Sequence, residues 1–432
     1  MAFLSFARTA SLACLFGCGS DPGPSAEDAS PPDAAAATRA IISRSSASTW
    51  ESESSLASSG HELLAAWTGR TTLGEWFGEG PIGYAFSADD GETWQAPGTL
   101  AFEGRETPYN VKVSGDARGG FWAVWLGRSI TVHDAIVVAR ALPGTAAFEA
   151  PVEVTNPSAA NEGYDLPAIA THRGTALAAY TVYHASCMST EVARSDNGRD
   201  WTRTIAGRCE AAMPVRNLNA ICASESSTRI WLANVAGDPS AGNLRVELRH
   251  SDDDGKSFPA SSLQIVSSPG QHVACDPIAC TMQGDDLWLA YGLSDDAVEP
   301  GVFPKLTSIQ VLRISSAGIA RFEALDDASG FAMHPNLTSD PSGAIHVVYH
   351  AGARDDDPAG QLRSTRLAAG AAAFEPSRPL DGPLLFNQQW GETGFLGDYD
   401  GLAIAGNSLA AAYAFGAGSD VHVAFQRWST QP

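Results

Sequence analysis

The sequence predicts an all-β chain made of seven repeated units of four strands. A strand-like segment that ends in an aromatic residue, or once in Asn234, occurs seven times, and its final residues lie 54 to 64 residues apart. A turn motif of eight residues occurs three times. The 432 residues include 42 Gly and 25 Pro but few long amphipathic stretches, which favours many strands joined by turns. Repeats of this length are typical of one long β architecture rather than of several ordinary domains.

The turn motif reads Ser-x-Asp-x-Gly-x-x-aromatic, with Arg194 in place of Ser in the second copy and Phe258 in place of Trp in the third. Ser and Asp side chains bond to nearby backbone amides, Gly supplies the positive φ, and the aromatic residue fastens the loop to the sheet. An apolar run precedes each copy, so we expect each one to close a β-hairpin. The copies are residues 87–94, 194–201 and 251–258.

Two strands of each unit can be placed from composition. The aromatic-ending segments are 63–67, 121–125, 176–180, 230–234, 287–291, 345–349 and 409–413. Shorter segments precede them; they are poor in charge and rich in small residues, as strands crowded around an axis should be. These predicted innermost strands are 54–57, 111–114, 168–171, 218–222, 278–282, 337–340 and 402–405.

The remaining strands complete each unit. A third strand follows the aromatic residue, then the turn motif or a substitute loop ending in Phe-Glu, then a fourth strand. We expect Phe148, Phe322 and Phe374 to replace the aromatic residue of the motif in those loops. The seventh unit stops after its third strand, so residues 39–44 are predicted to pair with 421–428 and to close the ring.

The turn motif resembles the Asp-box of BNR-repeat proteins, the sialidase-like β-propellers. The resemblance implies a β-propeller. The seven copies of the repeat indicate seven four-stranded antiparallel blades, with six blades, as in well-known sialidases, as the alternative count. The resemblance covers nearly the whole folded part, but its motifs are motifs of the fold. In that family the Asp-box is structural and lies away from the central site.

The N-terminal segment resembles a bacterial lipoprotein signal. Arg8 precedes a short apolar stretch, and the segment 15–18 reads Leu-Phe-Gly-Cys, so lipid would be attached at Cys18. We therefore expect a signal peptide at 1–17, a tether rich in Ser, Pro, Ala and Asp at 18–37, and the propeller at 38–432. Ordinary secretion is the alternative. No later segment is long and apolar enough to predict a transmembrane helix, so the membrane would be met through the lipid alone, at the cell envelope.

The net charge limits the possible binding partners, and the cysteine positions limit the possible disulfides. The formal net charge of −22 repels phosphate backbones and disfavours nucleic acid. After processing, five Cys remain. Cys187 can pair with Cys209 and Cys222 with Cys280, although pairing of Cys275 with Cys280 competes. The spacing of paired metal ligands is lacking, so we expect neither a metal nor a cofactor, and we expect a monomer.

Ligands of a propeller usually bind at one end of the axis, where the innermost strands begin. Polar residues recur at these entries, and a concave site with carboxylates, Tyr, His and one Arg suits a polyhydroxylated ligand. The alternative is that they solvate the mouth or cap strand ends. The predicted ligand-binding residues are Tyr109, Asn110, Tyr164, Asp165, Arg216, Asn217, Asp276, Asn336 and Asp400.

Catalysis is predicted around Tyr399. It lies beside Asp398, and the sialidase resemblance implies a Tyr nucleophile paired with a carboxylate. His272 and His334 open neighbouring units and are predicted acid–base groups. The chain departs from sialidases in one respect: those enzymes hold the sialic-acid carboxylate with three Arg, whereas only Arg216 lies at an entry here.

Three functions remain open. The first is a sialidase-like protein that binds glycans in the axial funnel, with cleavage of the bound glycan as a further expectation. The second is a non-catalytic scaffold that binds another envelope protein at its rim. The third, suggested by other seven-bladed propellers, is a polysaccharide lyase that uses His and Tyr.

Overall fold

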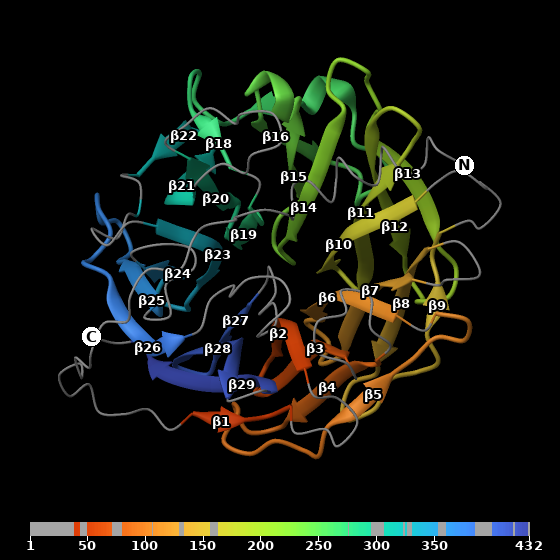
Figure 1. The fold of residues 1–432 in the computed structure, drawn as a ribbon, viewed down its shortest axis with the longest axis vertical. Helices are drawn as coiled ribbons and strands as arrows, with labels where there is room; N and C mark the ends of the chain where they lie inside the picture. The colour runs from red at the N-terminus through yellow and green to blue at the C-terminus, as the bar shows by residue number, and fades with distance from the viewer. Residues whose placement is uncertain are drawn as a thin grey trace.

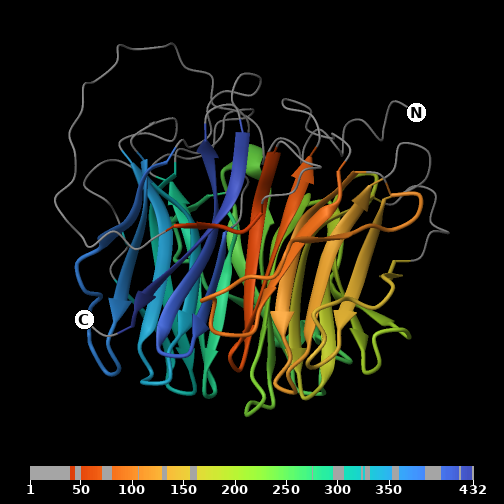
Figure 2. The ribbon, with the colours of Figure 1, turned by 90° about the horizontal axis from the view of Figure 1, so that it is seen from below.

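The chain forms a ring of seven antiparallel four-stranded blades around a central axis (Figure 1), in a computed structural model. The structure describes residues 39–43, 50–70, 80–105, 107–128, 134–155, 163–274, 276–294, 306–322, 325, 331–352, 360–384, 400–417 and 420–430. The blades follow one another around the ring in chain order, and Figure 2 shows their strands running along the axis. The predicted seven-bladed β-propeller is confirmed, and the alternative of six blades is wrong.

Each blade begins at the axis and ends at the rim. Blade 1 consists of β2 (Trp50–Ser59), β3 (Glu62–Arg70), β4 (Ile82–Ser87) and β5 (Gly98–Leu100). Blade 2 consists of β6 (Thr107–Gly115), β7 (Phe121–Arg128), β8 (Ala135–Ala141) and β9 (Val152–Glu153). Blade 3 consists of β10 (Gly163–His172), β11 (Thr175–Tyr183), β12 (Met188–Ser195) and β13 (Thr202–Gly207). Blade 4 consists of β14 (Val215–Ala223), β15 (Ile230–Gly237), β16 (Arg245–Ser251) and β17 (Gln264–Ile265).

The other three blades vary this plan. Blade 5 has an interrupted innermost strand and consists of β18 (His272–Val273), β19 (Ala279–Gln283), β20 (Asp286–Ser294), β21 (Leu306–Ser315) and β22 (Gly318–Arg321). Blade 6 consists of β23 (Phe331–Ser339), β24 (Ile345–Gly352), β25 (Gly360–Leu367) and β26 (Arg378–Leu384). Blade 7 consists of β27 (Gly401–Ala405), β28 (Ser408–Ala417), β29 (Asp420–Ser429) and β1 (Ala40–Ile41). Two short 3₁₀ turns, at Pro239–Ala241 and Ala260–Ser262, lie in the connections of blade 4.

The second strand of each blade is the most hydrophobic because a neighbouring blade covers each of its faces. Every residue of β11 and β15 is buried, and so is all of β7 except its last residue. Strands covered on both faces read as nearly continuous apolar runs rather than as alternating ones. Their aromatic residues, such as Trp67, Trp125 and Tyr180, lie in the middle of the observed strands and are almost completely buried.

The N-terminal strand closes the ring, as predicted. Ala40 and Ile41 of β1 pair antiparallel with Phe425 and Ala424 of β29. The pairing continues in Ile42, whose amide donates to the carbonyl of Val423 at 3.1 Å. The outer edge of β29 is therefore covered by a strand from the opposite end of the chain.

The Asp-box turns have the predicted hydrogen bonds. In the first, Ser87 Oγ accepts from the amide of Gly91 at 2.8 Å and donates to Asp89, which accepts from the amide of Thr93. The third repeats these contacts with Ser251, Asp253, Gly255 and Ser257.

The predicted register of the second Asp-box is wrong by one residue. Ser195, not Arg194, occupies the Ser position: it is the last residue of β12 and accepts from the amide of Gly198 at 2.8 Å. Asn197 performs the task of the Asp, accepting from the amides of Arg199 and Asp200. The turn is one residue shorter than the other two. A pattern of fixed length therefore placed Arg194, instead of Ser195, at the Ser position.

The aromatic residue of each box packs against the preceding blade. The ring centroid of Trp94 in blade 1 lies 4.7 Å from that of Phe425 in blade 7, and Trp201 in blade 3 makes an edge contact with Trp122 in blade 2. The prediction is confirmed for two of the three substitute residues, whereas Phe322 stacks on Trp288 of its own blade 5. Phe148 of blade 2 packs on Tyr84 and Phe86 of blade 1, and Phe374 of blade 6 on Phe322 of blade 5.

Two disulfides are present among the described cysteines. Cys187 and Cys209 span the hairpin that carries the second Asp-box, with a Cα–Cα distance of 5.4 Å. Cys222 and Cys280 join the innermost strands of blades 4 and 5, with a Cα–Cα distance of 6.1 Å. The competing Cys275–Cys280 pairing is therefore wrong. No helix within the described ranges is long and apolar enough to cross a membrane.

Candidate functional site

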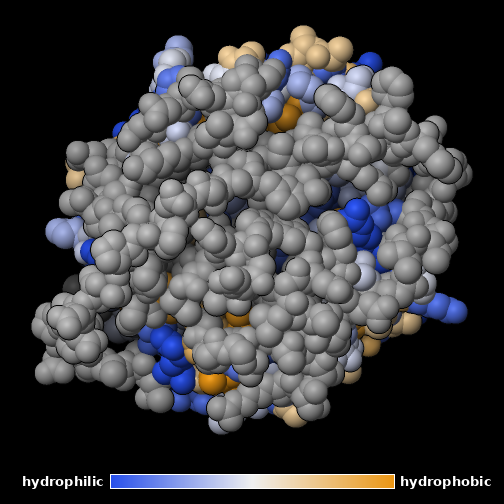
Figure 3. Space-filling model, viewed as in Figure 1, coloured by the Kyte–Doolittle hydropathy of each residue, from blue (hydrophilic) through white to orange (hydrophobic). Residues whose placement is uncertain are grey.

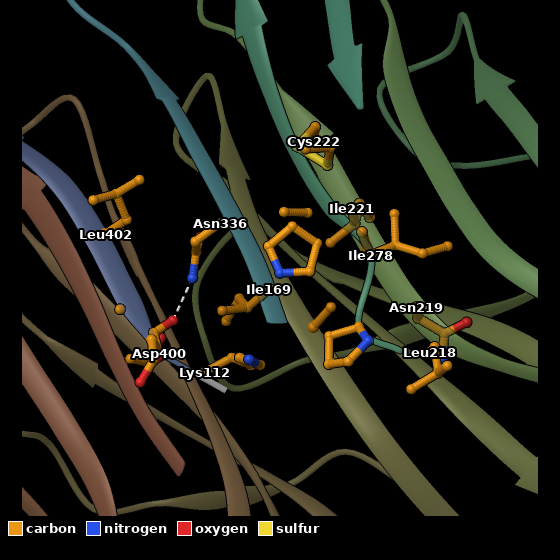
Figure 4. Close-up of a pocket in the computed structure, with 18 of the residues that line it drawn as sticks. Lys112, Ile169, Leu218, Asn219, Ile221, Cys222, Ile278, Asn336, Asp400 and Leu402 are labelled. Atoms are coloured by element: carbon orange, nitrogen blue, oxygen red, sulfur yellow. Dashed lines mark hydrogen bonds between the residues drawn. A yellow bond between two sulfur atoms is a disulfide. The ribbon is translucent and has the colours of Figure 1, made fainter. Parts of the chain in front are cut away.

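A cavity of about 180 Å³ lies on the axis and is lined by the innermost strands of all seven blades. Its walls are mostly apolar, including Ile169, Ile221, Ile278 and Leu402. The polar side chains at its lining come from blades 1, 2, 4, 6 and 7, and they are Ser55, Lys112, Asn219, His334, Asn336 and Asp400. Figure 4 shows Asn336 and Asp400 on one side of this cavity and Asn219 with Leu218 on the other. An apolar pocket with a few convergent polar groups is a typical small-molecule site.

Five innermost strands carry a β-bulge next to this cavity, and the bulge places a residue in the left-handed region. The residues are Glu53, Asn110, Leu166, Leu218 and His334, with φ between 50° and 57°. Glu, Leu and His rarely adopt this backbone conformation, because it costs about 1–2 kcal/mol for each such residue, whereas Asn adopts it more readily. A bulge redirects the side chains beside it, and bulges are common next to binding sites. Five equivalent bulges around one axis therefore mark this end of the propeller.

Polar residues at the bulges connect one blade to the next. Glu53 of blade 1 accepts from the amide of Asn110 in blade 2 at 3.1 Å, and Asn110 Nδ2 donates to Asp165 of blade 3 at 2.8 Å. Asp165 also accepts from Tyr183 at 3.0 Å. Burial raises the pKa of Asp165 to about 6, although its hydrogen bonds to Leu166, Tyr183 and Asn110 oppose the shift. These contacts hold three blades in register around the cavity.

A second chain of contacts links blades 5, 6 and 7. The amide of His334 donates to Asp276 at 3.1 Å, and His350 binds Asp400 through Nε2. The rings of His334 and His350 lie 5.7 Å apart, edge to face. Burial, with the nearby His350, lowers the pKa of His334 to about 3. His334 is therefore a neutral imidazole near pH 7, which can accept or donate a hydrogen bond but carries no charge.

The predicted site residues fall into three groups. His334, Asn336 and Asp400 line the axial cavity. Tyr109, Asn110, Tyr164, Asp165, Asn217, Asp276 and His272 lie at the strand entries, as predicted, but not at its lining. Asp398 and Tyr399 lie outside the described residues, as do Cys18 and the whole segment 1–37.

Arg216 belongs to none of these three groups: it lies where blade 4 faces blade 3 rather than at the cavity. It is completely buried, and its guanidinium is paired with Glu247 of β16. Its side chain packs against Gly207 of β13, where a Cβ atom would lie 2.6 Å from Arg216 Cδ. Its predicted role as a ligand-binding residue remains a prediction, but the partner found here is a carboxylate of the chain itself.

Three polar lining residues, Ser55, Lys112 and Asn219, were not among the predictions. Lys112 interrupts the apolar pair Val111 and Val113 in β6, and Asn219 follows the bulge residue Leu218 in β14. Both lie one or two residues beyond the strand entries from which the site residues were chosen. A polar residue inside an otherwise apolar, small-residue innermost strand was the available signal. Within the described ranges no group of three or more His, Cys, Asp or Glu could hold a metal ion.

The fold is that of a seven-bladed β-propeller, and solved structures similar to it include sialidases. No protein-family model matches the sequence, and no curated protein sequence matches it significantly. Among solved structures, the Hadza microbial sialidase Hz136 aligns over 91% of this chain and 68% of its own, with a TM-score of 0.56 and 12% identity. A protein of unknown function from Dyadobacter fermentans aligns over 90% and 97%, with a TM-score of 0.51 and 12% identity.

An enzyme with a bound inhibitor is also similar. The sialidase of Trypanosoma rangeli, in complex with the inhibitor DANA, has a TM-score of 0.50 and 12% identity. The alignment covers 91% of this chain but 59% of that protein. At such identities the likeness shows the fold alone.

Proposed function

We propose that this protein binds a glycan or a similar small polar ligand in the axial cavity. The observation that carries the proposal is the cavity itself, which lies on the axis among the innermost strands of all seven blades, with bulges on five of them. Structural neighbours of the same fold include a sialidase crystallised with the inhibitor DANA. That protein's ligand supports the class of ligand proposed here.

The composition of the lining suits a sugar. A pyranose ring has apolar C–H faces and a circle of hydroxyl groups, so it needs both apolar walls and donors and acceptors of fixed direction. Ile169, Ile221 and Ile278 supply the first, and Lys112, Asn219 and Asn336 the second. Because the walls belong to seven separate blades, the ligand would contact most of the ring at once.

The described residues support binding more directly than cleavage. Asp165 and Asp276 are hydrogen-bonded to neighbouring blades, and His334 is neutral near pH 7. Hydrolysis by a Tyr nucleophile depends on Tyr399 with Asp398, and the lyase depends on Tyr399 with His272 or His334. Both reactions remain proposals that the same experiment separates from binding.

The test is a glycan array and a hydrolysis screen on the soluble form that begins near Ala37. Two variants accompany the wild type: Asn219→Leu, which removes a polar group from the cavity, and Tyr399→Phe. Asn407→Leu, on the turn between β27 and β28 and away from the lining, is the matched control. Binding lost in Asn219→Leu but kept in Asn407→Leu supports the axial site, and turnover lost in Tyr399→Phe supports catalysis. A folded wild type that binds no glycan refutes the proposal.

A scaffold function is the second candidate because apolar side chains are exposed on outer strands. Ile205 of β13, Ile265 of β17 and Ile319 of β22 belong to successive blades 3, 4 and 5, and are 57%, 51% and 39% exposed. Hydrophobic residues are visible at several places along the rim in Figure 3. A charged substitution, Ile205→Asp with Ile265→Asp, would abolish capture of an envelope partner without changing glycan binding.

We further propose that the protein is exported and held at the cell envelope by lipid on Cys18. Two disulfides in one chain fit an oxidising compartment. Cys18→Ser would move the protein from the membrane fraction to the soluble fraction, whereas unchanged fractionation would refute the anchor.

A further inference from the structure

Three arginines surround one glutamate where blade 4 faces blade 3. Glu247 Oε1 accepts from Arg245 Nε at 3.2 Å and Nη2 at 2.7 Å. Glu247 Oε2 accepts from Arg249 Nη1 at 3.0 Å and from Arg216 Nη1. The side chains of Glu247 and Arg216 are fully buried and that of Arg249 is 6% exposed. We call these four residues the arginine cluster, and none of them lines the axial cavity.

The space for this cluster results from one residue of blade 4 that differs from the repeat. The aromatic residue that ends the predicted second-strand segment in six units is Asn234 in blade 4. Arg216 pairs with Ala236, which pairs with Arg245, so these residues lie in one row across β14, β15 and β16. Alternate residues of a strand share a face, which puts Asn234 and Glu247 on the same side. The short side chains of Asn234 and Ala236 thus leave the space that an aromatic ring fills in the other six blades.

The cluster carries an excess of positive charge. Its buried part holds Arg216, Arg249 and Glu247. At its outer end Arg245 is 32% exposed, and Glu210, which is 51% exposed, lies 3.9 Å from Arg216 Nη2. Three guanidinium groups and two carboxylates leave a net charge of about +1 in a site from which water is largely excluded. Burial and the neighbouring Arg216 lower the pKa of Arg249 although Glu247 opposes the shift, as expected where a cation lacks full compensation.

Several buried N–H groups of the cluster have no acceptor among the described residues. They are Arg216 Nε, Arg216 Nη2 and Arg249 Nε. Buried polar groups are nearly always hydrogen-bonded, and guanidinium donors the more so because their desolvation costs several kcal/mol. Asn234 Oδ1 is buried without a donor on the same face of blade 4, which suits a water molecule bound beside a further ligand.

We propose that the arginine cluster is a binding site for one small monovalent anion, held by the free N–H groups of Arg216 and Arg249. The anion would neutralise the excess charge and satisfy the donors together. The complete burial of Arg216 restricts it to the size of chloride or of a formate-like carboxylate. It would enter beside Arg245 and Glu210, the exposed end of the cluster. The site is separate from the axial cavity and would stabilise the contact between blades 3 and 4.

The test measures unfolding of the soluble protein in sodium salts of equal ionic strength. Chloride and formate are compared with isethionate, an anion too large for the site. Because an anion that binds only the folded state lowers the unfolding constant, each tenfold increase of its concentration above Kd should lower that constant about tenfold. An effect of chloride alone identifies a halide site, and an effect of formate a carboxylate site. Equal unfolding constants in all three salts would overturn the proposal.

Two variants separate this site from general salt effects. Glu210→Gln removes a half-exposed negative charge, raises the net charge of the cluster, and should shift the anion dependence to lower concentrations. Glu375→Gln is the matched control, since Glu375 is 46% exposed and pairs with Arg366. Arg249→Met makes the cluster neutral and should abolish the anion dependence. If Arg249→Met does not fold, Glu210→Gln still decides: an anion dependence that does not change from the wild type refutes the site.

Discussion

Removal of the Cys222–Cys280 disulfide should destabilise the protein by about 4 kcal/mol. The bond joins β14 to β19 and closes a loop with a sequence separation of 58. In the chain-entropy description, cross-linking such a loop removes about 14 cal/mol/K from the unfolded ensemble, or about 4 kcal/mol at 25 °C. The same reasoning for Cys187–Cys209, with a separation of 22, gives about 3 kcal/mol. The longer loop should therefore cost more to lose by about 1 kcal/mol.

The variants are Cys222→Ala with Cys280→Ala, and Cys187→Ala with Cys209→Ala. Alanine is preferred to serine because Cys222 and Cys187 are buried and a hydroxyl group there would lack a partner. Guanidinium unfolding, followed by tryptophan fluorescence and by circular dichroism, measures both losses. A loss below about 1 kcal/mol for the first pair, or a larger loss for the second pair, would refute the entropic reasoning.

Three further predictions concern the turns, the bulges and the ring closure. Gly91→Ala should cost at least 1 kcal/mol more than Gly104→Ala in a denaturant titration: both glycines have positive φ, but a Cβ on Gly91 would lie 2.3 Å from Phe425, whereas none lies within 4 Å of Gly104. Equal losses would contradict that contact. As the pH rises from 3 to 7, the wild type should lose about 3 kcal/mol relative to Asp165→Asn, because the folded pKa of Asp165, raised from 3.8 to about 6, makes the folded state hold its proton longer than the unfolded state does. Parallel stability–pH curves would argue against a buried, protonated Asp165. Deletion of residues 39–43 should expose the edge of β29 and cause self-association, seen by size-exclusion chromatography; a monomer of unchanged stability would show that β1 is dispensable.

The sevenfold repeat could be predicted from the sequence because the burial of each second strand requires a run of apolar residues within that strand. Each second strand is covered on both faces, so it must be apolar along its length, and seven such strands at a nearly constant period define seven blades. Ring closure could be predicted for a related reason: one unit lacked a fourth strand, and residues 39–44 were left without a partner. The substitute aromatic residues, such as Phe148, followed from their place in the same repeat.

The site was only partly readable. Strand entries follow from the strand assignments, and three residues chosen there, His334, Asn336 and Asp400, line the axial cavity. Asn110 and Asp165 are bonded between blades instead, because a bulge decides which way each side chain points. A bulge is a mismatch between two paired strands, so neither strand reveals it alone. Lys112 and Asn219 were missed for that reason.

The sequence by itself determined the fold class, the number of blades, the closing strand and the hydrogen bonds of the repeated turn motif. These properties depend on patterns within a single repeat. The tertiary structure alone decided that Cys222 pairs with Cys280 rather than with any other cysteine, that Ser195 and not Arg194 completes the second Asp-box, and that Arg216 faces Glu247 inside blade 4. Each depends on which residues of neighbouring strands or blades meet, and that is set by pairing register and packing between segments distant in the sequence.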